Sequence, residues 1–221
     1  MISNRAYTSY YKEEIKKYKK MLYSNKELPK ENDVISIIKK IIFMKILNYD
    51  KKPEHYRKCI IYDMLMLMHS LTQNSIINFY FLYRAYIENF LRVSLNLGDN
   101  DETGVRNLFV EFENKYNSKE LEAFINYIKG EYGKGCNYVH SNIKSMKTVH
   151  LYYKEIIETD EMDDKNLIHL IQKLNTLLDK CVEFMILTQV EEIENVFYRK
   201  SEQLKFLIGN KNYKIYKDNL I

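Results

Sequence analysis

Residues 76–97, which read IINFYFLYRAYIENFLRVSLNL, decide the fold class. Apolar and aromatic side chains recur every three or four positions, and Gly98, followed by Asp-Asn-Asp, ends the pattern. This spacing is that of an α-helix, and a helix with so few polar positions is expected to be mostly buried. We therefore predict a long helix over 76–97 that packs inside a helical fold.

The same periodicity covers most of the chain. It predicts further helices over about 3–24, 32–48, 53–71, 103–116, 118–129 and 165–208, the last with a break near 188–194. Only 6 Gly and 2 Pro occur in 221 residues, too few for the turns of a β-sandwich or β-barrel. We expect an all-α fold: an antiparallel helical bundle of four to five core helices with peripheral helices and a long C-terminal helix.

The domain organisation that we predict is a single all-helical domain over 1–221. It comprises N-terminal helices within 1–50, a core bundle over 53–208 and a loosely held tail over 210–221. Inside the predicted helix over 53–71, Asp63 is expected to pair with an Arg or Lys across the bundle.

Composition limits the classes of function. The net charge is only +4, from 34 basic and 30 acidic residues, which allows RNA as a partner without requiring it. Three widely spaced Cys and the lack of an apolar leader or of a span long enough for a bilayer predict a cytoplasmic protein with no membrane contact. No phosphate-binding Gly-rich loop, dinucleotide fingerprint or metal-ligand spacing occurs, so we expect no cofactor and no metal.

A polar stripe interrupts the apolar helix over 76–97. Arg84, Glu88 and Arg92 are spaced i, i+4, i+8, and Asn89 falls within the same polar arc. One interpretation is a solvated face whose ion pairs are worth about 0.3–0.5 kcal/mol each. The other is a pair of guanidinium groups, held by Glu88, that binds a phosphate or another anion. Because a half-buried helix needs some polar face, both interpretations stay open.

A second polar feature is the stretch YGKGCNYVHSN over 132–142, beside Gly130. The glycines predict a bend, followed by a short helix that carries Asn137 and His140 on one side. His140 is either a packed or capping histidine or a general acid and base. An arginine stripe with one His would suffice for RNA cleavage without a metal ion, in which a 2′-hydroxyl attacks the adjacent phosphate.

The pattern Tyr-Arg-x-x-x-Glu-Asn-x-x-Arg over 83–92, followed about fifty residues later by Tyr-Val-His-Ser over 138–141, resembles HEPN-type helical proteins of bacterial abortive-infection and toxin systems. The resemblance covers roughly 80–142. It implies a helical bundle, a homodimer and, for many members, metal-independent RNase activity. The family's hallmark is an Arg followed by a His four to six residues later; here His140 matches the His, and Lys134 stands at the place of the Arg.

The first hypothesis is therefore an anti-phage or toxin-type endoribonuclease. His140 would be the acid and base, Arg84 and Arg92 would hold phosphate, and Glu88 would orient the two arginines. The residues expected to bind substrate are Lys134, Asn137, Asn89 and Ser141. Because Lys lacks the bidentate fork of Arg, a second hypothesis remains: a non-catalytic helical interaction or regulatory module of a defence system, with an antitoxin or phage protein as its partner.

Overall fold

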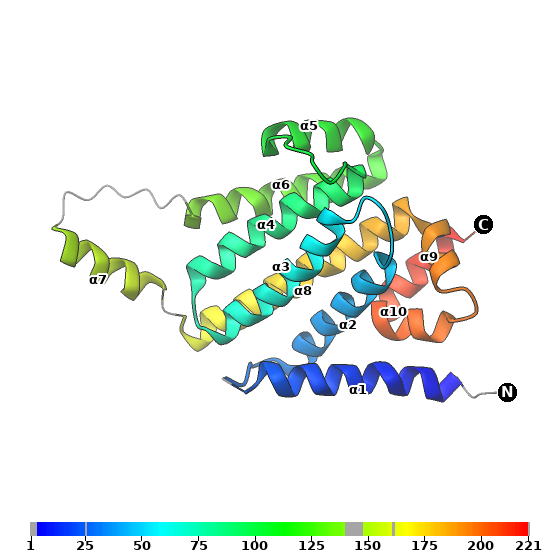
Figure 1. The fold of residues 1–221 in the computed structure, drawn as a ribbon, viewed down its shortest axis with the longest axis horizontal. Coiled ribbons are helices and arrows are strands. Elements are labelled where there is room, and N and C mark those ends of the chain that lie inside the picture. Colours follow the sequence, from blue (N-terminus) through cyan, green and yellow to red (C-terminus); the bar gives the residue numbers. More distant parts are fainter. Residues whose placement is uncertain (1–3, 25, 140–147, 161, 221) are drawn as a thin grey trace. The chain divides into compact units, whose positions relative to one another are not determined.

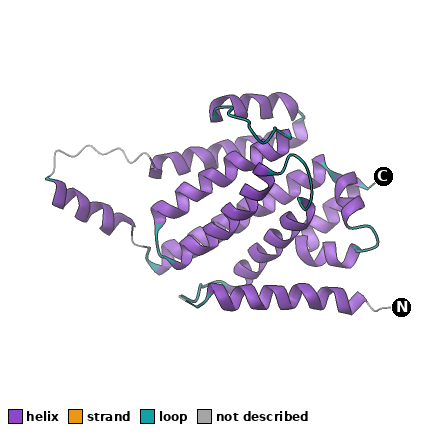
Figure 2. Ribbon diagram, viewed as in Figure 1, coloured by secondary structure: helices purple, strands orange, loops and turns teal. Residues whose placement is uncertain are grey.

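The computed structural model describes residues 4–24, 26–139, 148–160 and 162–220 (Figure 1). Within these ranges the chain forms ten helices and no strand, which confirms the predicted all-α class (Figure 2). The helices are α1 (Asn4–Leu22), α2 (Glu31–Leu47), α3 (His55–Thr72), α4 (Ile76–Leu95), α5 (Val105–Lys115), α6 (Lys119–Val139), α7 (Val149–Asp160), α8 (Asp164–Thr188), α9 (Val190–Val196) and α10 (Ser201–Asn219).

The chain divides into two compact units. The first contains residues 1–50 and 168–221, and the second contains residues 51–167. The N-terminal helices α1 and α2 thus belong with the C-terminal helices α9 and α10, not with the segment that follows them. No helix in the described ranges is both long and apolar enough to cross a membrane.

Helix α4 is the centre of the second unit, where it packs against α3, α5 and α6. The predicted helix over 76–97 is therefore confirmed, with its end two residues earlier. Ser75 begins α4 by accepting a hydrogen bond from the Asn78 N–H, and Asn96 ends it in the left-handed conformation, with φ 57°. Fully buried aromatic side chains of α4, among them Phe79, Tyr83 and Tyr86, form the core, each worth about 1.5–3 kcal/mol of burial.

The N-terminal end of α3 is fastened to the connection that follows α4. Arg57 Nη2 donates to Asn96 Oδ1 at 2.9 Å, the backbone N–H of His55 donates to Asp99 Oδ1 at 2.8 Å, and the Tyr56 hydroxyl donates to the carbonyl of Asp101. These bonds fix the loop that leaves α4, and Arg92 lies near the start of that loop.

The first unit is built around α2. Helix α10 and helix α1 both pack on it, and Phe43 of α2 stacks on Phe197, just after α9, with ring centroids 5.9 Å apart. The predicted break in the C-terminal helical region is confirmed, because α8 ends at Thr188 and two separate helices follow. The predicted loose tail over 210–221 is wrong: α10 continues to Asn219, and Asn212 and Tyr216 are buried.

The predicted bend over Gly130–Gly135 is also wrong. Helix α6 runs without interruption from Lys119 to Val139 and includes all three glycines of this stretch, Gly130, Gly133 and Gly135. Each glycine costs a helix only about 1 kcal/mol relative to Ala, so the packing of α6 against α4 outweighs the local preference. His140 and Ser141 lie outside the described residues.

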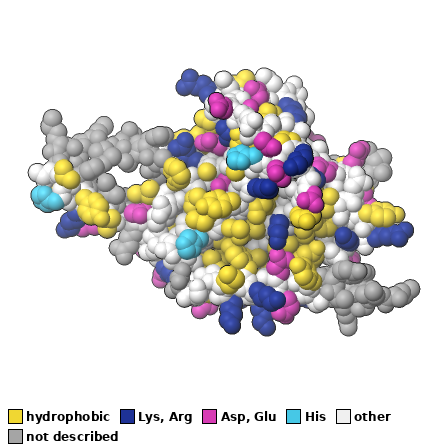
Figure 3. All heavy atoms as spheres, in the orientation of Figure 1, with side chains coloured by type: hydrophobic (Ala, Val, Ile, Leu, Met, Phe, Trp, Pro, Cys, Tyr) yellow, Lys and Arg dark blue, Asp and Glu magenta, His cyan; other side chains and the backbone are white. Residues whose placement is uncertain are grey.

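Helix α7 exposes apolar side chains. Val149, Leu151, Tyr153 and Ile157 are each at least half exposed, and yellow side chains are visible on this helix at the left of Figure 3. At its C-terminal end, the carboxylate of Asp160 accepts hydrogen bonds from the Ser75 hydroxyl and the backbone N–H of Ile77. These bonds attach the end of α7 to the first turn of α4.

Candidate functional site

The predicted stripe on α4 exists. Glu88 lies between the two arginines, with Arg84 Nη2 3.6 Å from its Oε1 and Arg92 Nη1 3.9 Å from its Oε2. The side chains of Arg84, Glu88 and Arg92 are 18%, 27% and 13% exposed, so the stripe is mostly covered and not a solvated face. Both ion-pair distances exceed that of a good hydrogen bond, which means that Glu88 attracts the guanidinium groups without saturating their N–H donors.

Tyr132 of α6 closes the Arg84 end of the stripe. Arg84 Nη2 donates to the Tyr132 hydroxyl at 2.8 Å, and this hydroxyl donates to Glu88 Oε1 at 2.9 Å. The guanidinium carbon of Arg84 also lies 5.1 Å from the centroid of the Tyr132 ring. Burial raises the pKa of Tyr132 to about 12, and the hydrogen bond to Glu88 acts in the same direction. The hydroxyl therefore stays protonated at neutral pH and bridges the two charged groups.

Arg92 holds the other end of the stripe to the loop after α4. Its Nη2 donates to the carbonyl oxygen of Thr103 at 3.0 Å, and its Nε lies 3.7 Å from Asp101 Oδ1. Its guanidinium carbon lies 5.1 Å from the centroid of the Tyr56 ring on α3. Arg92 thus joins α3, α4 and the loop in one cluster, which gives it a structural role in addition to any functional one.

Gly135 explains how α6 approaches the stripe. A Cβ atom at this position would lie 2.7 Å from Cγ of Arg84 and 3.6 Å from the backbone oxygen of Tyr80. Only a glycine leaves room for the Arg84 side chain between the helices. The last turns of α6 therefore lie against Arg84. The exposed Asn137 follows two residues later, and Val139 ends the helix immediately before His140 in the sequence.

Lys134, which stands where the resemblance to HEPN-type proteins leads us to expect an Arg, interacts with its own helix. Its Nζ lies 2.7 Å from Oε1 of the buried Glu131, whose other carboxylate oxygen accepts a hydrogen bond from the Tyr83 hydroxyl at 2.8 Å. The Lys134 side chain is 63% exposed. Lys134 therefore pairs with Glu131 of its own helix, whereas Arg84 and Arg92 pair with Glu88 of α4.

Asn89 faces α3. Its Nδ2 donates to Asp63 Oδ2 at 2.8 Å, and Asp63 is buried. Burial raises the pKa of Asp63 to about 6; the hydrogen bond from Asn89 opposes this shift, and the charge of Glu88 adds to it. The prediction of an Arg or Lys partner for Asp63 is wrong, because an amide fills that place. Asn89 is therefore engaged in the helix interface.

The structure brings the predicted stripe together, whereas His140 and Ser141 lie outside the described residues. It also gives two residues of α6 roles that the sequence analysis did not assign to them. Arg84, Glu88 and Arg92 form one cluster, and the end of α6 that leads to His140 packs beside Arg84. Tyr132 and Gly135 are the additions; their i, i+3 spacing places both on the α6 face that meets α4, which was the available signal.

In the part of the chain that the structure describes, no three His, Cys, Asp or Glu side chains are grouped so as to hold a metal ion. Comparison with known proteins adds no relative: no family model, curated protein or solved structure matches this chain significantly.

Proposed function

We propose that this chain is a HEPN-like protein of the bacterial anti-phage or toxin type that cleaves RNA without a metal ion. The observation that carries the proposal is the contact between Gly135 and Arg84, which packs the last turns of α6 beside the arginine stripe. His140 follows α6 directly in the sequence. The resemblance over 80–142 supplies the reaction class, and the α4–α6 contact supports a shared location for the arginines and the histidine.

The proposed reaction needs a proton carrier and a cation. The 2′-hydroxyl of one nucleotide attacks the adjacent phosphorus, so that a bond from O2′ to phosphorus forms and the bond from phosphorus to O5′ breaks. His140 takes the hydroxyl proton, and the imidazolium that forms returns this proton to the leaving 5′-oxygen. Arg84 and Arg92 offset the extra negative charge of the phosphorane. The products are a 2′,3′-cyclic phosphate and a free 5′-hydroxyl.

The stripe can exchange its internal contacts for a phosphate. Glu88 lies 3.6 Å and 3.9 Å from the two guanidinium groups, whereas a phosphate oxygen would bind an arginine N–H at about 2.8 Å. Glu88 would then orient the arginines, and Asn137, Ser141 and Lys134 would contact RNA at the rim. Asn89, held by Asp63, would act by supporting the helix interface and not by contacting substrate. A homodimer, as the resemblance implies, would pair two such sites.

Cleavage of RNA in the presence of a chelator tests the proposal. Purified protein is incubated with total RNA and EDTA, and the ends of the products are identified. We expect 2′,3′-cyclic phosphate ends, and loss of cleavage for His140→Ala and Arg84→Ala. Arg106→Ala removes an exposed arginine of α5 and is the matched control, which should keep full activity. Undiminished cleavage by both His140→Ala and Arg84→Ala would exclude this site.

A second candidate function is favoured by the internal pairing of the stripe. Arg84, Arg92 and Lys134 all have carboxylate partners within the chain, which suits a helical interaction or regulatory module that does not turn over RNA. Its partner would be an antitoxin or a phage protein. The same assay separates the two candidates: folded wild-type protein that leaves RNA intact would favour the interaction module.

A further inference from the structure

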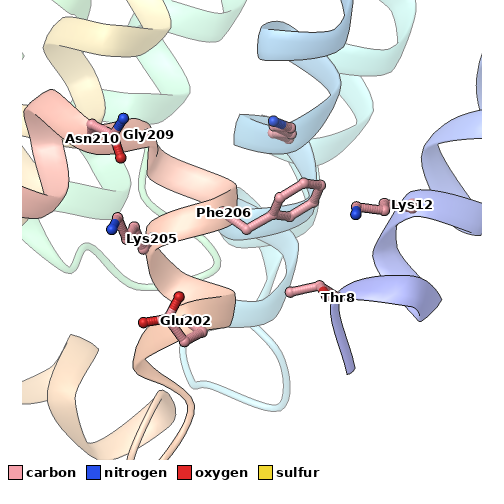
Figure 4. A pocket seen from close by; sticks show the side chains of 8 residues that line it. Thr8, Lys12, Glu202, Lys205, Phe206, Gly209 and Asn210 are labelled. Carbon is pink, nitrogen blue, oxygen red and sulfur yellow. The ribbon is translucent and has the colours of Figure 1, made fainter. Parts of the chain in front are cut away.

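The first unit contains an open pocket of about 370 Å³ between α1, α2 and α10. Its lining includes Lys12 of α1, Lys39 of α2, and Glu202, Lys205, Phe206 and Gly209 of α10. A volume in this range is typical of small-molecule sites. Figure 4 shows Phe206 and Lys12 pointing toward one another from α10 and α1.

Two ammonium groups gather at the Phe206 ring. Lys39 Nζ lies 4.1 Å from the ring centroid, and Lys12 Nζ lies 6.0 Å from it. The ring attracts each cation weakly, yet it cannot neutralise their charges, which repel one another. Lys205 also lines the pocket, with its Nζ 5.8 Å from the centroid of the Tyr213 ring.

The three lysines lack counter-charges. In the described residues, none of Lys12, Lys39 and Lys205 has a carboxylate within ion-pair distance. Glu202 is the carboxylate among the lining residues, so three positive charges stand against one negative charge. Burial lowers the pKa of Lys39, and the nearby charge of Lys12 lowers it further. An anion bound beside Lys39 would favour its protonated form and would so oppose both of these pKa shifts.

The neighbouring Lys40 differs from Lys39, because Lys40 has a counter-charge within the chain. Lys40 is buried, and its Nζ lies 2.9 Å from Asp179 Oδ1 and donates hydrogen bonds to Ser36 and Asn175. Lys39, one residue earlier, has no such partner. A desolvated cation without a partner costs stability, and such sites are commonly kept for a ligand.

Gly209 lies in the pocket wall, at a break in α10. Its φ of 80° and ψ of 167° interrupt the helical path of α10 at the pocket, and this φ is one that residues with a side chain rarely adopt. A Cβ added at Gly209 would meet no atom within 4 Å.

We propose that this pocket binds the phosphate chain of a small ligand, such as a nucleoside triphosphate, through Lys12, Lys39 and Lys205. Three cations favour a chain of phosphates over a single charge, and a ligand of this kind suits the pocket volume. The Phe206 ring offers an apolar surface for a base or sugar beside the phosphates. This site is in the first unit. Its test does not depend on the function that we propose for the arginine stripe on α4.

Calorimetric titration tests this site with inorganic triphosphate, inorganic phosphate and ATP at low ionic strength. Triphosphate should bind more tightly than phosphate. Lys12→Gln and Lys39→Gln should each weaken triphosphate binding by about fivefold to tenfold, because each removes one charge near the ligand. The matched control is Lys17→Gln, which removes an exposed lysine of α1 outside the pocket lining and should bind like wild type.

ATP distinguishes the sources of the phosphate chain. Equal affinity for ATP and triphosphate would show that the phosphates alone are recognised. Tighter binding of ATP that is lost in Phe206→Leu would show that the Phe206 ring contacts the base or sugar. Either result supports the site. A second readout is thermal unfolding. Triphosphate should raise the melting temperature of wild type but not of Lys39→Gln, and Lys39→Gln without ligand should be no less stable than wild type.

Two results would overturn the proposal. The first is no binding of triphosphate or ATP to the folded wild-type protein. The second is an equal loss of binding in Lys17→Gln and in the two pocket variants, since general surface charge would then explain the affinity.

Discussion

Cγ of Arg84 occupies the space next to Gly135, where an added Cβ would come within 2.7 Å of it. Helix α6 therefore depends on a glycine at a position where helix propensity alone would favour alanine. This contact links the stability of the second unit to the candidate site, because the same arginine is held by Glu88 and Tyr132.

The first prediction concerns Gly135→Ala. Alanine would gain about 1 kcal/mol of helix propensity but would force Arg84 or α6 to move, and overpacking of this kind costs about 1–3 kcal/mol. We expect a net loss of stability in urea unfolding. Gly133→Ala is the matched control, because nothing lies within 4 Å of a Cβ at that position, and it should be more stable than wild type. Equal stabilisation by both substitutions would contradict the close packing of Arg84.

The second prediction concerns the pH dependence of stability. Burial raises the pKa of Asp63 from 3.8 to about 6, so the folded protein holds this proton more tightly than the unfolded chain does. The contribution of Asp63 is therefore fully present below pH 3.8 and is lost as pH rises through 6. The loss amounts to about 2–3 kcal/mol.

Asp63→Asn isolates this effect. The Asn side chain stays neutral and can still accept the hydrogen bond from Asn89, so the variant should be more stable than wild type at pH 8. At pH 4 the two proteins should differ little. A wild type that is more stable than Asp63→Asn at pH 8 would show that the carboxylate has a cationic partner after all.

The third prediction concerns the buried Lys40, whose side chain is 2% exposed. Asp179→Ala removes its carboxylate partner and should destabilise the protein by about 2–3 kcal/mol, because it leaves a buried cation without its counter-charge. Lys40→Met removes the cation itself and should cost less. Chemical denaturation of both variants provides the comparison, and the reverse order would contradict the structural role of this pair.

The fourth prediction concerns Tyr132→Phe, which removes one hydroxyl and keeps the ring beside Arg84. The loss of two hydrogen bonds should reduce stability by about 1–2 kcal/mol. RNA cleavage should fall less than in Arg84→Ala, since the guanidinium and its partner Glu88 remain. Cleavage that is lost equally in both variants would make the hydroxyl itself part of the chemistry.

Features set by neighbours in the sequence were predictable, and features set by packing between helices were not. The stripe of Arg84, Glu88 and Arg92 follows from helix geometry, and the structure confirms it. The end of α6 was predicted ten residues too early because the glycines were interpreted by local preference, whereas Gly135 serves the contact with α4. The amide partner of Asp63 depends on the register of α3 against α4, which no local pattern encodes.

The pocket with Lys12, Lys39 and Phe206 could not be predicted for the same reason. Its three walls come from α1, α2 and α10, and the last of these is more than 150 positions away from the others in the sequence. The sequence also predicted a loose tail after Gly209, whereas α10 continues beyond Gly209 and Tyr216 is buried. This wrong prediction is one reason why the pocket was not foreseen.

The most direct test of the central claim compares one RNA oligonucleotide with its fully 2′-O-methylated counterpart, both in excess EDTA. We expect the wild type to cut the RNA and to leave the methylated strand intact, because the methylated 2′-oxygen cannot attack. The His140→Ala variant should cut the RNA at least about 100-fold more slowly. Cleavage of both strands at similar rates, or an unchanged rate in His140→Ala, would contradict the claim.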